Sequence, residues 1–170
     1  MDNIILIGMP GVGKSTLGVL LAKTLGMTFL DTDLVIQEQE GALLRDLIAD
    51  RGIEGFLDLE GEVLRALDCR GAVIAPGGSC VCRPAAMERL RALGPVVYLR
   101  VPLDELERRV DNITTRGIAM APGETLSGVF ARREPLYRAY AGLTVDVAAG
   151  QSLEQTVAAV LAGLGRAGVL

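Results

Sequence analysis

The stretch Ile4-Ile5-Leu6-Ile7-Gly8-Met9-Pro10-Gly11-Val12-Gly13-Lys14-Ser15 decides the fold. It opens with a continuously apolar run, which is typical of a strand buried on both faces of a parallel sheet. Residues Gly8–Ser15 then fit the pattern G-x-x-x-x-G-K-[ST]. Leucines follow at helical spacing between Leu17 and Leu25, and Gly26 supplies a C-terminal stop. A strand, a glycine-rich loop and a helix in this order predict a phosphate-binding loop.

Each part of this loop suits a different part of a nucleotide. Glycines let backbone N–H groups converge on phosphate oxygens, and the helix N-terminus adds positive potential. Lys14 is expected to bridge the outer phosphates, and Ser15 to offer a hydroxyl to Mg²⁺. A fortuitous glycine-rich turn would not need the strand before it and the helix after it. The sequence therefore predicts nucleotide binding by the loop residues Gly11, Val12, Gly13, Lys14, Ser15 and Thr16.

Strands and helices alternate along the rest of the chain. Further strands are predicted at Thr28–Leu30, Ala72–Ala75, Val96–Val101 and Leu143–Val147. Helices are predicted at Leu34–Ala49, at Gly55–Leu67 and at Pro84–Leu93. Another helix follows the strand Val96–Val101 and ends at about Asp111, and one more is predicted at about Glu124–Tyr140. The last helix begins after Ser152, whose side chain can cap it. This alternation predicts an α/β fold, with a doubly wound parallel sheet of about five strands and flanking helices. We expect residues 1–170 to form a single domain.

Composition excludes several classes of protein. Half of the 170 residues are hydrophobic and 22% are charged, as in a folded globular protein. No stretch approaches the roughly 18 uncharged apolar residues of a membrane-spanning helix, and Asp2 stands where a secretory signal would carry positive charge. A net charge of −4 is unsuited to nucleic-acid binding, which needs a basic face. We therefore expect a cytoplasmic protein without nucleic-acid or membrane partners. It is expected to be a monomer, because no long amphipathic stretch is left over.

The available side chains also limit the chemistry. The chain has no histidine, which excludes Ser-His-Asp hydrolysis and His-ligated metal sites. Its three cysteines include Cys80 and Cys82, whose C-x-C spacing differs from the Cys-x-x-Cys redox pattern, so we expect reduced core residues. Acid–base chemistry must therefore use carboxylates, lysine or arginine.

Chemically active residues follow two of the predicted strands. Ligands of open α/β sheets bind at the carboxyl ends of the strands, so Asp31, Asp33 and the Gly77-Gly78 pair should meet the phosphate loop there. Asp31 could hold Mg²⁺ through water, and Asp33, on the same side if the strand persists, could take a proton from an acceptor hydroxyl. Helix capping is the competing interpretation for a single aspartate. The glycine pair permits close backbone approach to a ligand, although a simple turn explains it equally well.

Two arginines complete the candidate site. Residues Asn112–Gly123 show no periodicity and resemble a mobile lid, in which Arg116 would stabilise the transferred phosphoryl group and help to exclude water. Arg133 stands on a predicted helix near Pro135, where a surface salt bridge is the competing interpretation.

In combination, these motifs resemble those of the shikimate kinase family. The family's order and spacing are matched over nearly the whole chain by the phosphate loop, Asp31-Thr32-Asp33, Gly77-Gly78, Arg116 and Arg133-Glu134-Pro135-Leu136-Tyr137. The segment Gly41–Glu60 also resembles the family's substrate-binding region. The resemblance implies a P-loop fold like that of nucleoside monophosphate kinases, with a mobile lid. It further implies ATP-dependent phosphorylation of shikimate to shikimate 3-phosphate, a step of aromatic amino acid biosynthesis.

The resemblance also implies a role for each matching residue. Asp31 matches the magnesium-linked aspartate, and Asp33 matches the catalytic aspartate that holds the acceptor hydroxyls. Arg116 matches the lid arginine, which acts with Lys14 on the transferring phosphoryl group. The remaining matches contact the two substrates: Gly77 and Gly78 border the acceptor, Arg133 pairs with the shikimate carboxylate, and Arg109 packs on adenine.

Three departures from the family pattern fall in the acceptor region and the lid. The family's Phe-Arg-x-x-Glu is here Phe56-Leu57-Asp58-Leu59-Glu60, so Leu57 replaces a carboxylate-binding arginine. Ser79 replaces a third glycine, and Gly117-Ile118-Ala119 replaces Pro-Leu-Leu after the lid arginine. Losing one charge-assisted contact to a carboxylate costs about 1.5–3 kcal/mol, or roughly ten- to a hundredfold in binding. Glu60, Arg133 or one of the helix arginines could compensate for Leu57.

The sequence thus predicts a small-molecule kinase that uses ATP and Mg²⁺, with shikimate as the first acceptor to consider. A different small hydroxy acid or polyol stays open as the acceptor because of Leu57. The rival from another class is a nucleotide-binding module without catalysis, which would need neither Asp33 as a base nor a lid arginine. A nucleoside monophosphate kinase would share the fold, but the resemblance disfavours it.

Overall fold

Five parallel strands form one sheet in a computed structural model that describes residues 2–110 and 119–170. The strands are β1 (Ile4–Ile7), β2 (Thr28–Asp31), β3 (Ala72–Ala75), β4 (Val96–Arg100) and β5 (Leu143–Asp146). Their order is β2-β3-β1-β4-β5, and every neighbouring pair is parallel. The continuously apolar β1 therefore lies at the centre of the sheet, where all four of its residues have no exposed surface. The predicted α/β fold with a parallel sheet of about five strands is confirmed.

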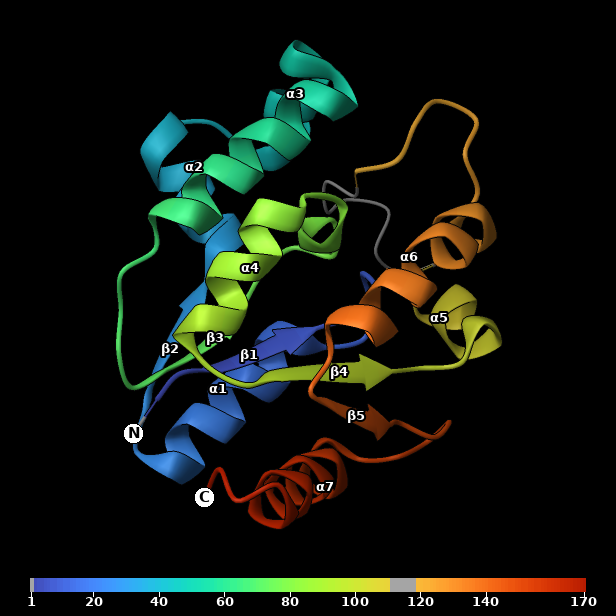
Figure 1. The fold of residues 1–170 in the computed structure, drawn as a ribbon. Helices are drawn as coiled ribbons and strands as arrows, with labels where there is room; N and C mark the ends of the chain where they lie inside the picture. The colour runs from blue at the N-terminus through green and yellow to red at the C-terminus, as the bar shows by residue number, and fades with distance from the viewer. Residues whose placement is uncertain (1, 111–118) are drawn as a thin grey trace.

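Helices cover both faces of this sheet. They are α1 (Lys14–Leu25), α2 (Thr32–Glu40), α3 (Leu44–Ala66), α4 (Pro84–Leu93), α5 (Leu103–Val110), α6 (Leu126–Tyr140) and α7 (Leu153–Arg166), with one 3-10 turn, η1 (Cys80–Cys82). Figure 1 shows α1 and α7 on one face, and α4 and α6 on the other. Within the described ranges, no helix combines the length and the apolar character needed to cross a membrane.

A second, smaller hydrophobic cluster lies beside the sheet. Figure 1 shows α2 and α3 beyond the carboxyl end of β2, away from the central core. Their apolar side chains pack on one another and on Ala119, which follows the undescribed segment; the buried members are Ile36, Leu44, Leu47, Phe56, Leu57, Leu59, Val63 and Ala119. This cluster fixes α3 at the same edge of the sheet as the phosphate loop.

Glycines set the ends of these elements, and one of them corrects a predicted helix. The helix predicted at Leu34–Ala49 is wrong, because α2 ends at Glu40 and Gly41 adopts a left-handed conformation with φ 65° that caps it. Only glycine adopts such an angle at little cost, so the chain turns there before α3 begins. The kink within α3 has the same origin, with Gly52 at φ 70° and ψ 175°.

Two predicted helix ends are confirmed. Gly26 caps the C-terminus of α1 with φ 68°. The side chain of Ser152 accepts a hydrogen bond from the backbone N–H of Gln155, and the Gln155 side chain accepts one from the backbone of Ser152. These reciprocal hydrogen bonds form a capping box at the start of α7.

Candidate active site

The phosphate loop joins β1 to α1 and holds Lys14 above its own backbone. Gly11 and Gly13 have φ values of 86° and 92°, which permit the tight course of the loop. The Nζ of Lys14 donates to the carbonyl oxygens of Gly8 at 2.8 Å and Met9 at 3.1 Å. Burial lowers the pKa of the Lys14 ammonium, while Asp33 raises it. A compact, positively charged cradle therefore lies at the N-terminus of α1.

Ser15 and Asp31 place two oxygen atoms next to each other at the edge of this cradle. The Ser15 hydroxyl donates to Oδ2 of Asp31 at 2.7 Å. The other carboxylate oxygen of Asp31 accepts from the backbone N–H of Asp33 at 3.0 Å, so Asp31 also caps α2. The capping interpretation thus holds for Asp31, whose side chain also contacts the phosphate loop through Ser15.

This pair of oxygen donors fits Mg²⁺. A hydroxyl and a carboxylate are the hard ligands that Mg²⁺ prefers, and Mg²⁺ often takes its other ligands from phosphates and water. Residues 2–110 and 119–170 contain no cluster of three or more His, Cys, Asp or Glu side chains that could hold a metal ion.

Asp33 lies on a helix and not on an extended strand. The assumption that β2 continues to Asp33 is wrong, because β2 ends at Asp31 and α2 begins at Thr32. Asp33 nevertheless lines the same cavity as Asp31, since the N-terminus of α2 opens at the carboxyl edge of the sheet. Burial raises the pKa of the Asp33 carboxyl to about 6, with a further rise from Asp31 and an opposing effect of Lys14. Such a carboxylate is a stronger base than an exposed aspartate.

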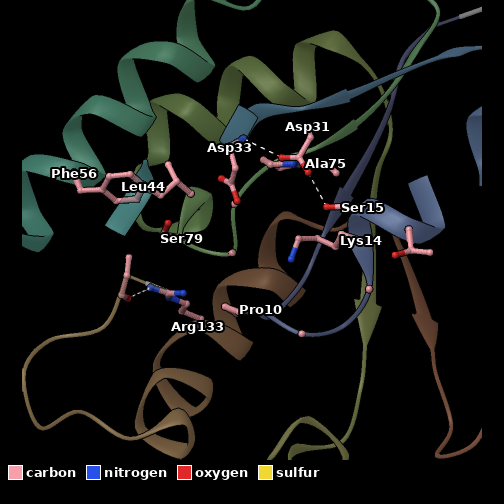
Figure 2. A pocket seen from close by; sticks show the side chains of 17 residues that line it. Pro10, Lys14, Ser15, Asp31, Asp33, Leu44, Phe56, Ala75, Ser79 and Arg133 are labelled. Carbon is pink, nitrogen blue, oxygen red and sulfur yellow. Dashed lines mark hydrogen bonds between the residues drawn. The ribbon is translucent and has the colours of Figure 1, made fainter. Parts of the chain in front are cut away.

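One cavity gathers most of the predicted residues from four parts of the chain: the phosphate loop, the end of β2 with the start of α2, the turn after β3, and α6. Figure 2 shows the side chains of Asp33, Lys14 and Arg133 pointing into the same space from three different elements. Leu44 and Phe56 form an apolar wall on the α3 side. The complete lining consists of Pro10, Gly11, Gly13, Lys14, Ser15, Thr16, Asp31, Asp33, Leu44, Phe56, Ala75, Pro76, Gly77, Gly78, Ser79, Ala119 and Arg133.

The glycine pair is needed because the protein's own groups fill the space around it. A Cβ atom on Gly77 would lie 2.4 Å from Oε1 of Glu60 and 2.9 Å from Oδ1 of Asp33. A Cβ atom on Gly78 would lie 2.8 Å from Cδ of Pro10, in the phosphate loop. A simple turn would not explain these close approaches. Gly77 thus faces the two carboxyl groups, and Gly78 faces the phosphate loop.

Arg133 is buried in the wall of the cavity. Only 1% of its surface is exposed, its Nη2 donates to the backbone oxygen of Ala119 at 2.7 Å, and its Nε has no hydrogen-bond partner among the described residues. The surface salt bridge predicted as the alternative is wrong for Arg133. The neighbouring Arg132 forms such a bridge, with Glu124. Arg133 is therefore a buried cation with a donor that no described residue uses.

Arg109 lies beside a second cavity that adjoins the phosphate loop. Its Nε pairs with Oε1 of Glu105 at 2.9 Å, and its Nη1 donates to the backbone oxygen of Val12 at 3.4 Å. The two cavities share Gly13 and Thr16, so a nucleotide on the loop could reach both. The second cavity is lined by Val12, Gly13, Thr16, Leu17, Arg109, Val147, Gln151, Leu153 and Thr156.

Glu60 is a buried acid to which the sequence alone assigned no definite role. It is 1% exposed, and its Oε2 accepts a hydrogen bond of 2.6 Å from the hydroxyl of Ser79. Burial raises the pKa of Glu60 to about 7, although the Ser79 hydrogen bond lowers it. One turn earlier on α3, Leu57 is buried in the smaller hydrophobic cluster. No cation from α3 therefore reaches this part of the site among the described residues.

The predicted site and the observed cavity differ in a few residues. Arg116 and most of the predicted lid lie outside the described residues. Leu44 and Ala119 line the cavity although neither was assigned a role: Leu44 lay within the segment Gly41–Glu60, and Ala119 was noted only as part of the altered sequence after the lid arginine. Isolated apolar residues cannot be told from core residues in a sequence. Tyr137 was visible only as part of a motif, and its hydroxyl donates to the backbone oxygen of Gly78 at 2.5 Å.

The chain is similar in sequence and in fold to one family of known proteins. A family model described as shikimate kinase matches residues 10–164. The shikimate kinase of Paracidovorax citrulli is 36% identical over 98% of this chain and 94% of its own length, and that of Mycobacterium avium is 41% identical over 84% and 82%. A solved structure of shikimate kinase from Acinetobacter baumannii in complex with shikimate covers 100% of this chain and 96% of its own, with a TM-score of 0.87 and 31% identity.

Proposed function

The chain belongs to the shikimate kinase family, and on this basis we propose that it transfers the γ-phosphoryl group of ATP to the 3-hydroxyl of shikimate. As a member of this family it is a small-molecule kinase that uses ATP. One observation carries the choice of acceptor: a buried arginine, Arg133, whose Nε has no partner in residues 2–110 and 119–170, shares a cavity with the phosphate loop and with Asp33. A hydroxy acid that binds there has a cation for its carboxylate and a base for its hydroxyl.

The nucleotide occupies the phosphate-loop end of the cavity. Backbone N–H groups between Gly11 and Thr16 hold the phosphates, and Lys14 neutralises charge on the outer ones. The Ser15 hydroxyl and, directly or through water, the Asp31 carboxylate would hold Mg²⁺, which would supply further positive charge at the outer phosphates. The adenine ring lies in the second cavity against the guanidinium of Arg109.

The acceptor occupies the other end of the same cavity. Its carboxylate pairs with Arg133, and the backbone of Gly77 and Gly78 borders its ring. The Asp33 carboxylate takes the proton of the attacking hydroxyl as the new P–O bond forms, and ADP leaves with the electron pair of the broken bond. With a pKa of about 6, Asp33 is mostly ionised at neutral pH and still basic enough to accept that proton. The raised pKa thus supports the role of a general base.

Two positions limit how tightly this acceptor is held. Leu57 supplies no charge, so Arg133 is the carboxylate's one cationic partner among the described residues of the acceptor end. Arg116, which resembles the family's lid arginine, is proposed to neutralise the transferring group together with Lys14. The buried position of Leu57 supports weaker acceptor binding than an arginine would give, with little effect on ATP.

The partners proposed for the protein are small molecules. We propose that a cytoplasmic monomer with a single kinase domain performs the reaction, without nucleic acid or a membrane. The net charge of −4 supports the absence of a nucleic-acid partner.

An ADP-release assay tests this proposal. Mg²⁺-ATP is supplied with shikimate up to millimolar concentration, and in parallel with a panel of other hydroxy acids, polyols and nucleoside monophosphates. We expect saturable turnover with shikimate alone. Turnover with another member of the panel, and not with shikimate, would contradict the acceptor assignment. ATP binding without turnover on any acceptor would instead support the non-catalytic module.

A further inference from the structure

Ser79 joins the acceptor end of the cavity to a buried carboxyl group behind it. Its side chain lines the cavity and is only 4% exposed. Its hydroxyl donates to Oε2 of Glu60 at 2.6 Å. This hydrogen bond joins the residue before the turn η1 to helix α3. Figure 2 shows Ser79 on the same side of the cavity as Asp33 and Leu44. The hydroxyl is therefore both next to the acceptor and fixed by a partner.

Glu60 depends on Ser79 for its hydrogen bonding. Its other carboxyl oxygen, Oε1, has no partner among the described residues and lies against Gly77. A buried carboxyl group that lost its single donor would be left without any hydrogen bond, which is costly. While Glu60 is ionised, the Ser79 proton is therefore committed to Glu60 and does not rotate toward the cavity.

This commitment decides what Ser79 can offer to a ligand. A hydroxyl group has one proton and two lone pairs, so an oxygen whose proton is used can only accept further hydrogen bonds. A carboxylate has no proton to donate, and the nearby acids Glu60 and Asp33 repel it. A hydroxyl of the ligand can donate to Ser79. The cavity thus offers a hydrogen-bond donor, Arg133, to the carboxylate of the ligand and a hydrogen-bond acceptor, Ser79, to one of its hydroxyls.

We propose that Ser79 is an acceptor-binding residue, whose hydroxyl oxygen accepts a hydrogen bond from a second hydroxyl group of the hydroxy acid, beside the one that faces Asp33. This inference rests on the proposed function, because it assumes an acceptor with several hydroxyls. Together with Arg133, the contact fixes how the acceptor is turned. It thereby determines which hydroxyl reaches Asp33.

The test compares the wild-type protein with Ser79→Ala, and with Ser127→Ala as a matched control on an exposed serine of α6. The assays run at pH 8, where Glu60, with a pKa of about 7, is mostly ionised. The Michaelis constants for shikimate and ATP are measured for each protein. Ser79→Ala should raise the shikimate constant about tenfold, the upper range for one hydrogen bond, and leave the ATP constant unchanged. Ser127→Ala should change neither constant.

Shikimate analogues that each lack one hydroxyl identify the partner of Ser79. The wild-type protein should bind one of these analogues about tenfold more weakly than shikimate, and Ser79→Ala should bind that analogue as the wild type does. For each of the other analogues, the loss of affinity relative to shikimate should be the same in both proteins. This pattern would assign the hydrogen bond to one hydroxyl of the acceptor.

The possible results separate this inference from the proposed function. An unchanged shikimate constant in Ser79→Ala would overturn the inference alone. Equal increases in the shikimate and ATP constants would also overturn it, because they would indicate a general distortion of the site. No turnover of shikimate by the wild-type protein would overturn the proposed function, and the inference with it.

Discussion

The two ends of the cavity are built in different ways. The phosphate end comes from one continuous segment, Gly8–Thr16, and is proposed to act mainly through backbone groups and a helix N-terminus. The acceptor end is assembled from α2, α3, the turn after β3, and α6, and it is proposed to act mainly through side chains. A local segment can be recognised from its spacing, whereas the acceptor end depends on how distant elements pack. Changes in specificity therefore belong at the acceptor end, where Leu57 and Ser79 stand.

The largest effect is expected where the two ends meet, at Asp33. Asp33→Asn removes the base that accepts the hydroxyl proton, so the turnover number should fall by about 10²–10⁴. ATP binding should stay nearly unchanged, because the phosphate loop does not use this carboxylate. Steady-state kinetics and a nucleotide-binding titration measure the two quantities. Asp50→Asn, at an exposed aspartate of α3, is the matched control and should have no effect.

A loss of ATP affinity in Asp33→Asn as large as the fall in turnover number would argue against two separable ends of the cavity. Retained turnover would argue against Asp33 as the base.

The adjacent glycines offer the sharpest separation of the two ends. Gly77→Ala pushes a Cβ toward Glu60 and Asp33, so it should raise the acceptor Michaelis constant more than that for ATP. Gly78→Ala pushes a Cβ toward Pro10, so it should raise the ATP constant more than Gly77→Ala does. Overpacking of this kind costs about 1–3 kcal/mol, or roughly five- to a hundredfold. Kinetics with each substrate varied in turn measure both constants.

Gly165→Ala serves as the control for the glycine variants, since nothing lies within 4 Å of a Cβ there. Identical effects of Gly77→Ala and Gly78→Ala on the two substrates would contradict the assignment of one glycine to each end.

Burial of Glu60 predicts a smaller effect, on stability. Its pKa is raised from 4.5 to about 7 in the folded protein, so the folded state binds a proton more readily than the unfolded state. This contribution is fully present below pH 4.5 and is lost as the pH rises through about 7. Glu60→Gln removes the effect, and so its melting temperature relative to wild type should rise between pH 5 and pH 8. The rise should be several degrees, as about 1 kcal/mol moves the melting temperature by about 2–4 °C at this size.

Thermal unfolding without nucleotide measures this effect, and Glu62→Gln on the exposed side of α3 is the control. Asp33, whose pKa is also raised, is present in both proteins, and its charge forms part of the effect because it also raises the pKa of Glu60. A difference in melting temperature that does not vary with pH would contradict the buried position of Glu60.

The features predicted best from the sequence are those that depend on residues close together in the chain. All five strands were placed to within about a residue, because apolar runs bounded by glycine or polar residues are a local signal. The phosphate loop and the Ser152 cap were local signals of the same kind. The Leu34–Ala49 helix failed because the apolar pattern continues through Gly41, and only the left-handed backbone there ends α2.

The acceptor end shows what the sequence could not supply. Leu57 could be recognised as a departure from the family pattern, but its burial in the same cluster as Ile36 and Ala119 required the fold. The hydrogen bond between Ser79 and Glu60 joins residues 19 positions apart, and nothing in their spacing indicates it. The burial of Arg133, in contrast to its neighbour Arg132, depends on which way α6 faces.

Titration of shikimate into the wild-type protein, Arg133→Gln and Arg132→Gln tests the central claim most directly, because one buried guanidinium should hold the acceptor carboxylate. Calorimetry should show saturable binding at one site in the wild type and in Arg132→Gln. Binding to Arg133→Gln should be at least about tenfold weaker, with ATP binding retained as evidence of an intact fold. Equal affinity for wild type and Arg133→Gln, or no saturable binding to the wild type, would contradict the account.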